Sequence, residues 1–216
     1  MTLRLSRHPA DALPAEGCAP RATQGSRTGH PEQDRKIALD AGHGASRGRA
    51  FTGAHGNGLV EDDLALDFVT RIGHHLRLIG YDTVITRPDG RLVSLATRGK
   101  RAIDGHCDLF VSIHLNAGPA SAGGVEAFVA EGDQRSRALA ERLVQAISTH
   151  GLRNRGAKWD SQSQYSSLRV LRDTYRHMPA VLLEIGFLTN AHDARLLADK
   201  HFREALAEEI AMALPG

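Results

Sequence analysis

A short apolar run that ends in a glycine turn, residues 37–44 (IALDAGHG), constrains the fold of this chain most strongly. A run of this length rich in Ile and Leu is typical of a buried strand, and Gly42 and Gly44 end it in a turn. Open α/β sheets place their functional groups just beyond the carboxyl ends of their strands. His43 stands at that position, and we therefore interpret it as a candidate metal ligand.

Predicted strands alternate with predicted amphipathic helices along the rest of the chain. The clearest helix repeats Leu64, Phe68, Ile72 and Leu76 on one face, at a spacing of four residues. The expected strands are 37–41, 81–86, 108–113, 125–130, 168–171 and 180–184, and the expected helices are 61–79, 92–103, 134–150, 192–198 and 201–214. This alternation predicts an α/β fold, a single domain with a largely parallel central sheet of about six strands flanked by helices.

The first 35 residues differ in composition from the rest. They are rich in Pro, Ala, Arg, Ser and Gly and show no apolar periodicity. Such a segment cannot bury enough apolar surface to offset the entropy lost on ordering. We expect residues 1–35 to be a flexible leader and residues 36–216 to form the globular domain, since 216 residues suit one domain with an appendage.

Composition restricts the partners that this chain can have. The formal net charge is +2 and the isoelectric point is about 8.7, which fits loose attraction to an anionic polymer. Only 5% of the residues are aromatic and none are interleaved with basic runs, so no nucleic-acid partner is expected. No apolar run approaches ~18 residues, so no membrane span is expected. We expect a monomer.

Four polar residues converge if the sheet is parallel. His43, His114 and Glu184 each stand at the carboxyl end of a predicted strand, and these ends share one edge of a parallel sheet. Glu61 opens the helix that follows the long glycine-rich loop of residues 44–60, so it can return to the same edge. Two imidazoles and one carboxylate, with a fourth position open to water, form a known catalytic zinc arrangement. A second carboxylate could then serve as general base.

Each of these residues also has a purely structural interpretation. Glu61 could simply be a favourable acid in the first turn of a helix. Glu184 follows three apolar residues, where a carboxylate is costly unless it is paired, protonated or functional, and a buried ion pair with Arg98 or Arg155 would satisfy it. His55, in the long loop, is a further candidate for substrate contact. Spacing alone leaves a metal site and a structural role equally open.

Four motifs in order resolve this ambiguity by resemblance. They are residues 39–44 (LDAGHG), 60–61 (VE), 112–117 (SIHLNA) and 183–190 (LEIGFLTN). Together they closely resemble the zinc-dependent N-acetylmuramoyl-L-alanine amidases of the Amidase_3 type, which hydrolyse bacterial cell walls. The resemblance runs from about Lys36 to Leu214.

The resemblance implies a fold, a reaction and a set of roles. Similar enzymes have a six-stranded sheet flanked by helices, and they cut the amide between the lactyl group of muramic acid and L-alanine of the peptidoglycan stem peptide. Carried over by motif, His43, Glu61 and His114 would bind one zinc ion per chain, and Glu184 would be the catalytic carboxylate. Another zinc peptidase or deacylase, or a non-catalytic glycan-binding module, are the alternatives.

The sequence departs from the family in two places and leaves the biological setting open. Leu115 stands where a small residue is more frequent, and only a loop, about 155–167, is expected where wall-division members carry a regulatory helical insertion. Residues 1–15 contain no continuous apolar segment of a secretory signal. We therefore expect a protein made in the cytoplasm that acts on the cell wall, as a phage endolysin does. A host autolysin exported by another route is the alternative.

Overall fold

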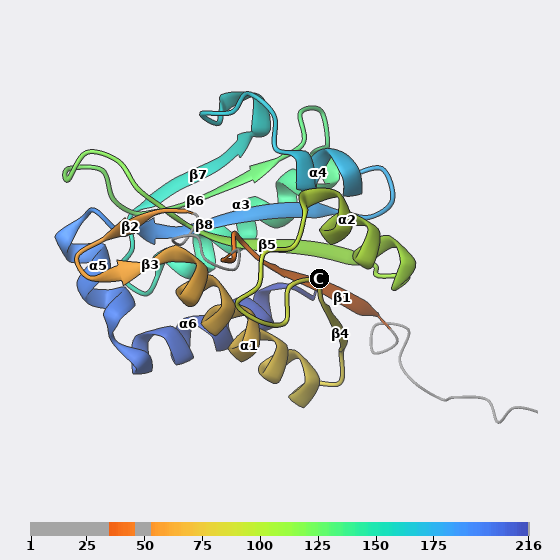
Figure 1. The fold of residues 1–216 in the computed structure, drawn as a ribbon, viewed down its shortest axis with the longest axis horizontal. Helices are drawn as coiled ribbons and strands as arrows, with labels where there is room; N and C mark the ends of the chain where they lie inside the picture. Colours follow the sequence, from red (N-terminus) through yellow and green to blue (C-terminus); the bar gives the residue numbers. More distant parts are fainter. Residues whose placement is uncertain (1–34, 46–52, 216) are drawn as a thin grey trace, which may run out of the picture.

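The computed structural model describes residues 35–45 and 53–215, in which a six-stranded sheet lies between two layers of helices (Figure 1). The strands are β1 (Lys36–Ala41), β2 (His55–Gly56), β3 (Leu59–Val60), β4 (Asp82–Ile85), β5 (Leu109–Asn116), β6 (Val125–Val129), β7 (Asn154–Trp159) and β8 (Ala180–Phe187). The helices are α1 (Glu61–Leu78), α2 (Leu95–Asp104), α3 (Gln134–Ser148), α4 (Arg169–Thr174), α5 (Ala191–Ala198) and α6 (Lys200–Ala213), with one 3-10 turn, η1 (Asp160–Gln162).

The central sheet has the order β4-β1-β5-β8-β6-β7. β4, β1, β5 and β8 are parallel, whereas β6 pairs with β8 in the antiparallel sense and β7 is parallel to β6. The prediction of an α/β domain with a largely parallel sheet of about six strands is therefore confirmed. The carboxyl ends of β1, β5 and β8 meet at one edge, and this edge carries the candidate site.

Alternate residues of the strands pack into two separate cores. Leu39, Ile113 and Leu183 belong to the larger core, which α1, α3 and α6 cover. Phe110 and Leu182 face the other way, into a smaller core beneath α2 and α4. Because both faces are covered, the central strands are apolar almost without interruption, as buried parallel strands are. In the part of the chain that the structure describes, no helix is both long and apolar enough to span a membrane.

The predicted helix boundaries agree best where local signals are strong. α1 begins at Glu61, where three acids in its first turn interact favourably with the helix dipole, and it ends at Leu78, one residue before the prediction. α2 begins at Leu95, three residues later than expected, because Ser94 is its N-cap and accepts a hydrogen bond from the Thr97 amide.

Three predicted segments differ from the structure. Residues 168–171, expected to be a strand, instead lead into α4, because a short apolar run suits one turn of a buried helix equally well. The interval 155–167, expected to be a loop, contains most of β7, an edge strand with few apolar residues to reveal it. Part of the long loop, expected without regular structure, forms the β2–β3 hairpin. The predicted leader, apart from Arg35, lies outside the described residues.

Candidate metal centre

His43, Glu61 and His114 come together at the carboxyl edge of the sheet. One ligand atom from each lies within 4.8 Å of the other two, and these three residues form a group that could hold a metal ion. His43 Nε2 lies 3.2 Å from Glu61 Oε2, and His114 Nδ1 lies 2.9 Å from Glu61 Oε1. The two imidazole rings are 5.0 Å apart and nearly perpendicular, at 74°. Residues from β5, from α1 and from the turn after β1 thus share one small volume.

Glu61 is the centre of this group. Its side chain is almost completely buried and accepts hydrogen bonds from the amides of Ala54 (2.6 Å) and Leu115 (3.1 Å), besides contacting both histidines. Burial would raise the pKa of Glu61, but the hydrogen bonds to His114 and His43 outweigh burial and hold this pKa well below its usual range. The lowered pKa favours the anionic carboxylate, the form that binds metals, and the contacts of Glu61 go beyond those of a first-turn acid.

The turn after β1 brings backbone and imidazole into close contact. A Cβ atom at Gly42 would lie 2.5 Å from Cε1 of His114, so only glycine fits beside this ring. His43 itself has a φ of 60°, a left-handed conformation that few non-glycine residues adopt. Strained residues of this kind persist only where their surroundings hold them in place.

Two buried arginines hold this turn in place. Arg87 donates to the carbonyls of Ala41 (2.8 Å) and Gly42 (2.9 Å). Arg98 donates to Asp40 Oδ1 (3.0 Å) and to the carbonyls of Ala41 and His43. Sequence reasoning missed this positioning role; its only signal was Asp40, a carboxylate inside a buried strand that needs a partner.

Glu184 on β8 lies directly beside the group. It pairs in register with His114 of β5 on one side and with Glu126 of β6 on the other. Its Oε2 atom is buried and has no hydrogen-bond partner among the described residues. Burial first, and then the negative charges of Glu61 and Glu126, raise the pKa of Glu184 well above its usual value. An unpaired carboxyl oxygen with a raised pKa makes Glu184 a candidate functional residue.

The ion pairs proposed for Glu184 are wrong. Arg98 pairs with Asp40, and Arg155 pairs with Glu126 at 2.7 Å. Lys158 also binds Glu126, at 2.6 Å, and the side-chain Nδ2 of Asn116 donates to it at 3.0 Å. Burial would raise the pKa of Glu126, but the hydrogen bonds from Lys158 and Arg155 lower it overall. Two cations on one carboxylate leave a net positive charge beside Glu184.

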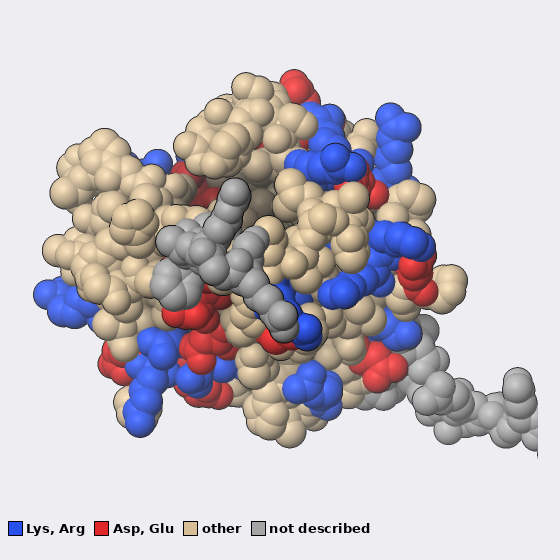
Figure 2. All heavy atoms as spheres, viewed as in Figure 1, with Lys and Arg blue, Asp and Glu red and all other residues tan. Residues whose placement is uncertain are grey.

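A cavity of about 910 Å³ opens onto these residues. His43, Glu61, His114 and Glu184 all line it, and its walls come from the start of α2 and the segment before α4. Figure 2 shows that this face is hollowed and that Lys and Arg side chains gather over α2 and α4. The donor set fits zinc, because two imidazole nitrogens and one carboxylate on an open cavity leave a position for water or substrate. His55 does not line the cavity and is exposed on β2.

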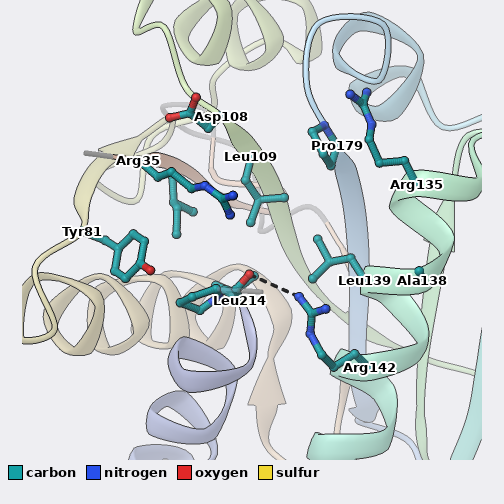
Figure 3. A pocket seen from close by; sticks show the side chains of 12 residues that line it. Arg35, Tyr81, Asp108, Leu109, Arg135, Ala138, Leu139, Arg142, Pro179 and Leu214 are labelled. Carbon is teal, nitrogen blue, oxygen red and sulfur yellow. Dashed lines mark hydrogen bonds between the residues drawn. The ribbon is translucent and has the colours of Figure 1, made fainter. Parts of the chain in front are cut away.

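A second cavity, of about 440 Å³, lies at the opposite edge of the sheet (Figure 3). Leu109, Leu139 and Leu214 line it, and Arg142 hydrogen-bonds the carbonyl of Leu214 across it. These contacts anchor the end of α6 to α3. None of the four predicted site residues lines it, whereas all four line the first cavity.

Comparison with known proteins agrees with this geometry. Residues 37–215 match the Amidase_3 family, described as N-acetylmuramoyl-L-alanine amidase. An uncharacterized Bacillus subtilis protein, YqiI, is 35% identical over 83% of this chain and 83% of its own length. The B. subtilis N-acetylmuramoyl-L-alanine amidase LytC is 33% identical over 84% of this chain but only 35% of its own length. The endolysin of Bacillus phage SPP1 is 33% identical over 80% of this chain and 62% of its own length.

Solved structures show the same fold. The N-acetylmuramoyl-L-alanine amidase AmiC2 of Nostoc punctiforme has a TM-score of 0.74 at 29% identity, covering 86% of this chain and 97% of its own. The catalytic domain of the amidase CwlV from Bacillus (Paenibacillus) polymyxa has a TM-score of 0.72 at 30% identity, covering 83% of this chain and 96% of its own. From its motifs, its fold and its relatives, the chain belongs to the Amidase_3 family of N-acetylmuramoyl-L-alanine amidases.

Proposed function

We propose that this cell-wall amidase is zinc-dependent and hydrolyses the amide bond between the lactyl group of N-acetylmuramic acid and L-alanine of the stem peptide. The observation that carries the proposal is the group of His43, Glu61 and His114, within 4.8 Å of one another on the large cavity, beside the unpaired Glu184. We propose that the protein acts as a monomer, since these four residues need none from a second copy to line the cavity together.

His43, Glu61 and His114 would hold the ion. When bound there, zinc would polarise the scissile carbonyl and make water a better nucleophile at neutral pH. The anionic form of Glu61, held by the amides of Ala54 and Leu115, would let it bind the ion without first losing a proton. Arg87 and Arg98 keep the His43 turn in its left-handed conformation, so the chain itself supplies the rigidity.

Glu184 would carry the proton. As the water oxygen forms its bond to the lactyl carbonyl carbon, the carboxylate of Glu184 accepts the water proton. It then delivers this proton to the nitrogen of L-alanine as the carbon–nitrogen bond breaks, leaving a lactyl carboxyl group and a free amine. A raised pKa suits both halves of this task, because the group must gain and lose a proton near neutral pH.

We also propose that the chain acts on the cell wall as a phage endolysin. The support is its likeness to the SPP1 endolysin, while the likeness to LytC fits the alternative, a host autolysin. In either setting the substrate is peptidoglycan, and the basic side chains over α2 and α4 would favour an anionic wall surface (Figure 2).

Turnover and metal content, measured together, test the proposal. Wild type, Glu184→Gln and His114→Ala would be incubated with purified peptidoglycan, and the products identified by mass spectrometry. We expect wild type to release stem peptides that begin with L-alanine. Glu184→Gln should keep about one zinc and lose at least about a hundredfold in turnover, whereas His114→Ala should lose both.

The exposed Glu141→Gln serves as the matched control and should behave as wild type. Cleavage inside the stem peptide would replace the proposed bond with that of a peptidase. Binding to peptidoglycan without zinc and without cleavage would leave only a glycan-binding module.

A further inference from the structure

Exposed apolar side chains gather at the mouth of the large cavity. Among the described residues, five large hydrophobic side chains are exposed, and three of them line this one cavity: Leu92 (49% exposed), Leu95 (50%) and Tyr165 (69%). The other two, Leu78 and Met212, lie on α1 and α6, away from the cavity. Single exposed apolar residues are ordinary, but a cluster at the mouth of a site indicates contact with a ligand.

The segment before α4 is built to present Tyr165. The Ser166 amide donates to the Ser163 carbonyl at 3.1 Å, which closes a turn with Tyr165 near its tip, and Ser166 has a left-handed φ of 56°. At its base, the fully buried Asp160 accepts from the Leu168 amide at 3.2 Å and pairs with an arginine of α4 at 2.6 Å. These contacts anchor the backbone of the segment that carries Tyr165 beside the cavity.

The opposite wall is tied to the metal centre. The Leu92 amide donates to the Ala45 carbonyl at 2.9 Å, two residues beyond His43. Arg98, which holds the His43 carbonyl, also donates to the Val93 carbonyl at 3.0 Å. The wall that carries Leu92 is therefore hydrogen-bonded to the turn that carries His43.

The charge of the residues around Leu92, Leu95 and Tyr165 indicates which part of the substrate fits there. Besides the three apolar residues, uncharged Ser94 and Gln164 line the same walls, and the nearby Arg169 is paired with Asp173. Sugar rings offer apolar faces and hydroxyl groups, which suit such a mixture. Stem peptides carry free carboxylates, which suit the net positive charge around Glu126 instead.

We propose that Leu92, Leu95 and Tyr165 form a glycan-binding rim on which the muramoyl sugar and its neighbours in the glycan strand lie. The ring of Tyr165 stacks against a sugar face, and the two leucines contact its apolar substituents. The inference rests on the proposed function, because the rim is continuous with the proposed catalytic site. It goes further by assigning the sugar side of the substrate to one wall of the cavity.

Two substrates that differ only in the sugar test the rim. Steady-state kinetics would compare N-acetylmuramoyl-L-alanyl-D-isoglutamine with its sugar-free lactoyl counterpart. For Tyr165→Ala we expect KM on the muramoyl substrate to rise about fivefold to tenfold with little change in kcat, and no change on the lactoyl substrate. Tyr165→Phe keeps the ring and should behave as wild type.

Leu78→Ala and Met212→Ala remove the other exposed apolar side chains and should leave both substrates unaffected. An equal loss on both substrates in Tyr165→Ala would overturn the inference, since the rim would then contact the lactoyl peptide. No loss on either substrate would overturn it too. So would a molar mass in solution for Tyr165→Ala that is half that of wild type, because the rim would then bind a second copy of the chain.

A binding measurement separates the rim from the proposed reaction. Glu184→Gln, with and without Tyr165→Ala, would be sedimented with purified peptidoglycan. We expect the double variant to be retained at least about threefold less. If wild type cleaves neither substrate, the proposed function fails, but the binding difference still tests whether the rim binds glycan. Equal retention of the two variants would refute the glycan-binding rim even if wild type cleaves.

Discussion

Glu61, Glu126 and Glu184 lie close together around the candidate metal centre, yet their surroundings shift their pKa values in different directions. Glu61 contacts two histidines and two backbone amides and is held anionic. Glu126 is buried but binds two cations, so it is anionic as well. Glu184 has burial and two negative neighbours without a cation, which together raise its pKa. One residue type thereby meets three different electrostatic environments, which suit the ligand and proton-carrier roles proposed for Glu61 and Glu184.

Glu126→Gln isolates the structural anion. At neutral pH, loss of the charge leaves Arg155 and Lys158 without their carboxylate and should lower the free energy of unfolding by about 2 kcal/mol. Because the folded state lowers the pKa of Glu126, its stabilisation is complete above the ordinary value of 4.5 and is lost as the pH falls below it. Denaturant unfolding of both proteins from pH 7 to pH 3 should show the difference shrinking. A difference that is constant with pH would contradict this.

The sequence led to the four candidate residues but not to what holds them. The structure brings His43, Glu61 and His114 together and places Glu184 beside them, while their roles in binding and catalysis stay predictions. Family motifs carried this prediction, since spacing alone left a structural role open. Arg87 and Arg98 were not foreseen as supports of the turn, because contacts from side chain to backbone carbonyl leave no periodic signal.

At the scale of the element, the glycine turn after β1 fixes how close the candidate ligands can come. Gly42→Ala places a methyl group against the His114 ring, which hydrogen bonding to Glu61 prevents from moving freely. We expect at least about a tenfold loss in zinc affinity, with a smaller change in melting temperature than core substitutions cause. Zinc titration monitored by calorimetry measures it. Gly90→Ala, which meets no atom within 4 Å, is the control; equal affinities would contradict the prediction.

Strands that are buried on both faces could be predicted from the sequence, whereas the edge strand β7 could not. The nearly continuous apolar runs of β1, β5 and β8 identified them as buried strands. β7, with the sequence NRGAKW, lies at the edge and follows no clear alternation. The antiparallel direction of β6 could not be predicted either, because strand periodicity is the same in parallel and antiparallel sheets. The β5–β8 pairing has a bulge just after Glu184, and Gly186 was the only sequence signal for it.

For the whole molecule, a ligand that binds only the folded state adds to its stability. If His43, Glu61 and His114 hold zinc, free zinc at about a thousandfold excess over its Kd contributes about 4 kcal/mol, or a rise of about 10 °C in Tm. Calorimetry before and after chelation, and after zinc is restored, should show this shift. His114→Ala should show none; an equal shift in that variant would place the ion elsewhere.

The cavity in Figure 3 has a consequence for how this domain can be joined to others. Arg35 and Pro215, at the two ends of the described chain, line the same cavity at the amino-terminal edge of the sheet. The candidate metal centre lies at the opposite edge, so tethers attached at either end would leave the cleft accessible to an extended polymer. A short peptide joining the two ends would likewise close the chain into a ring without crossing the cleft.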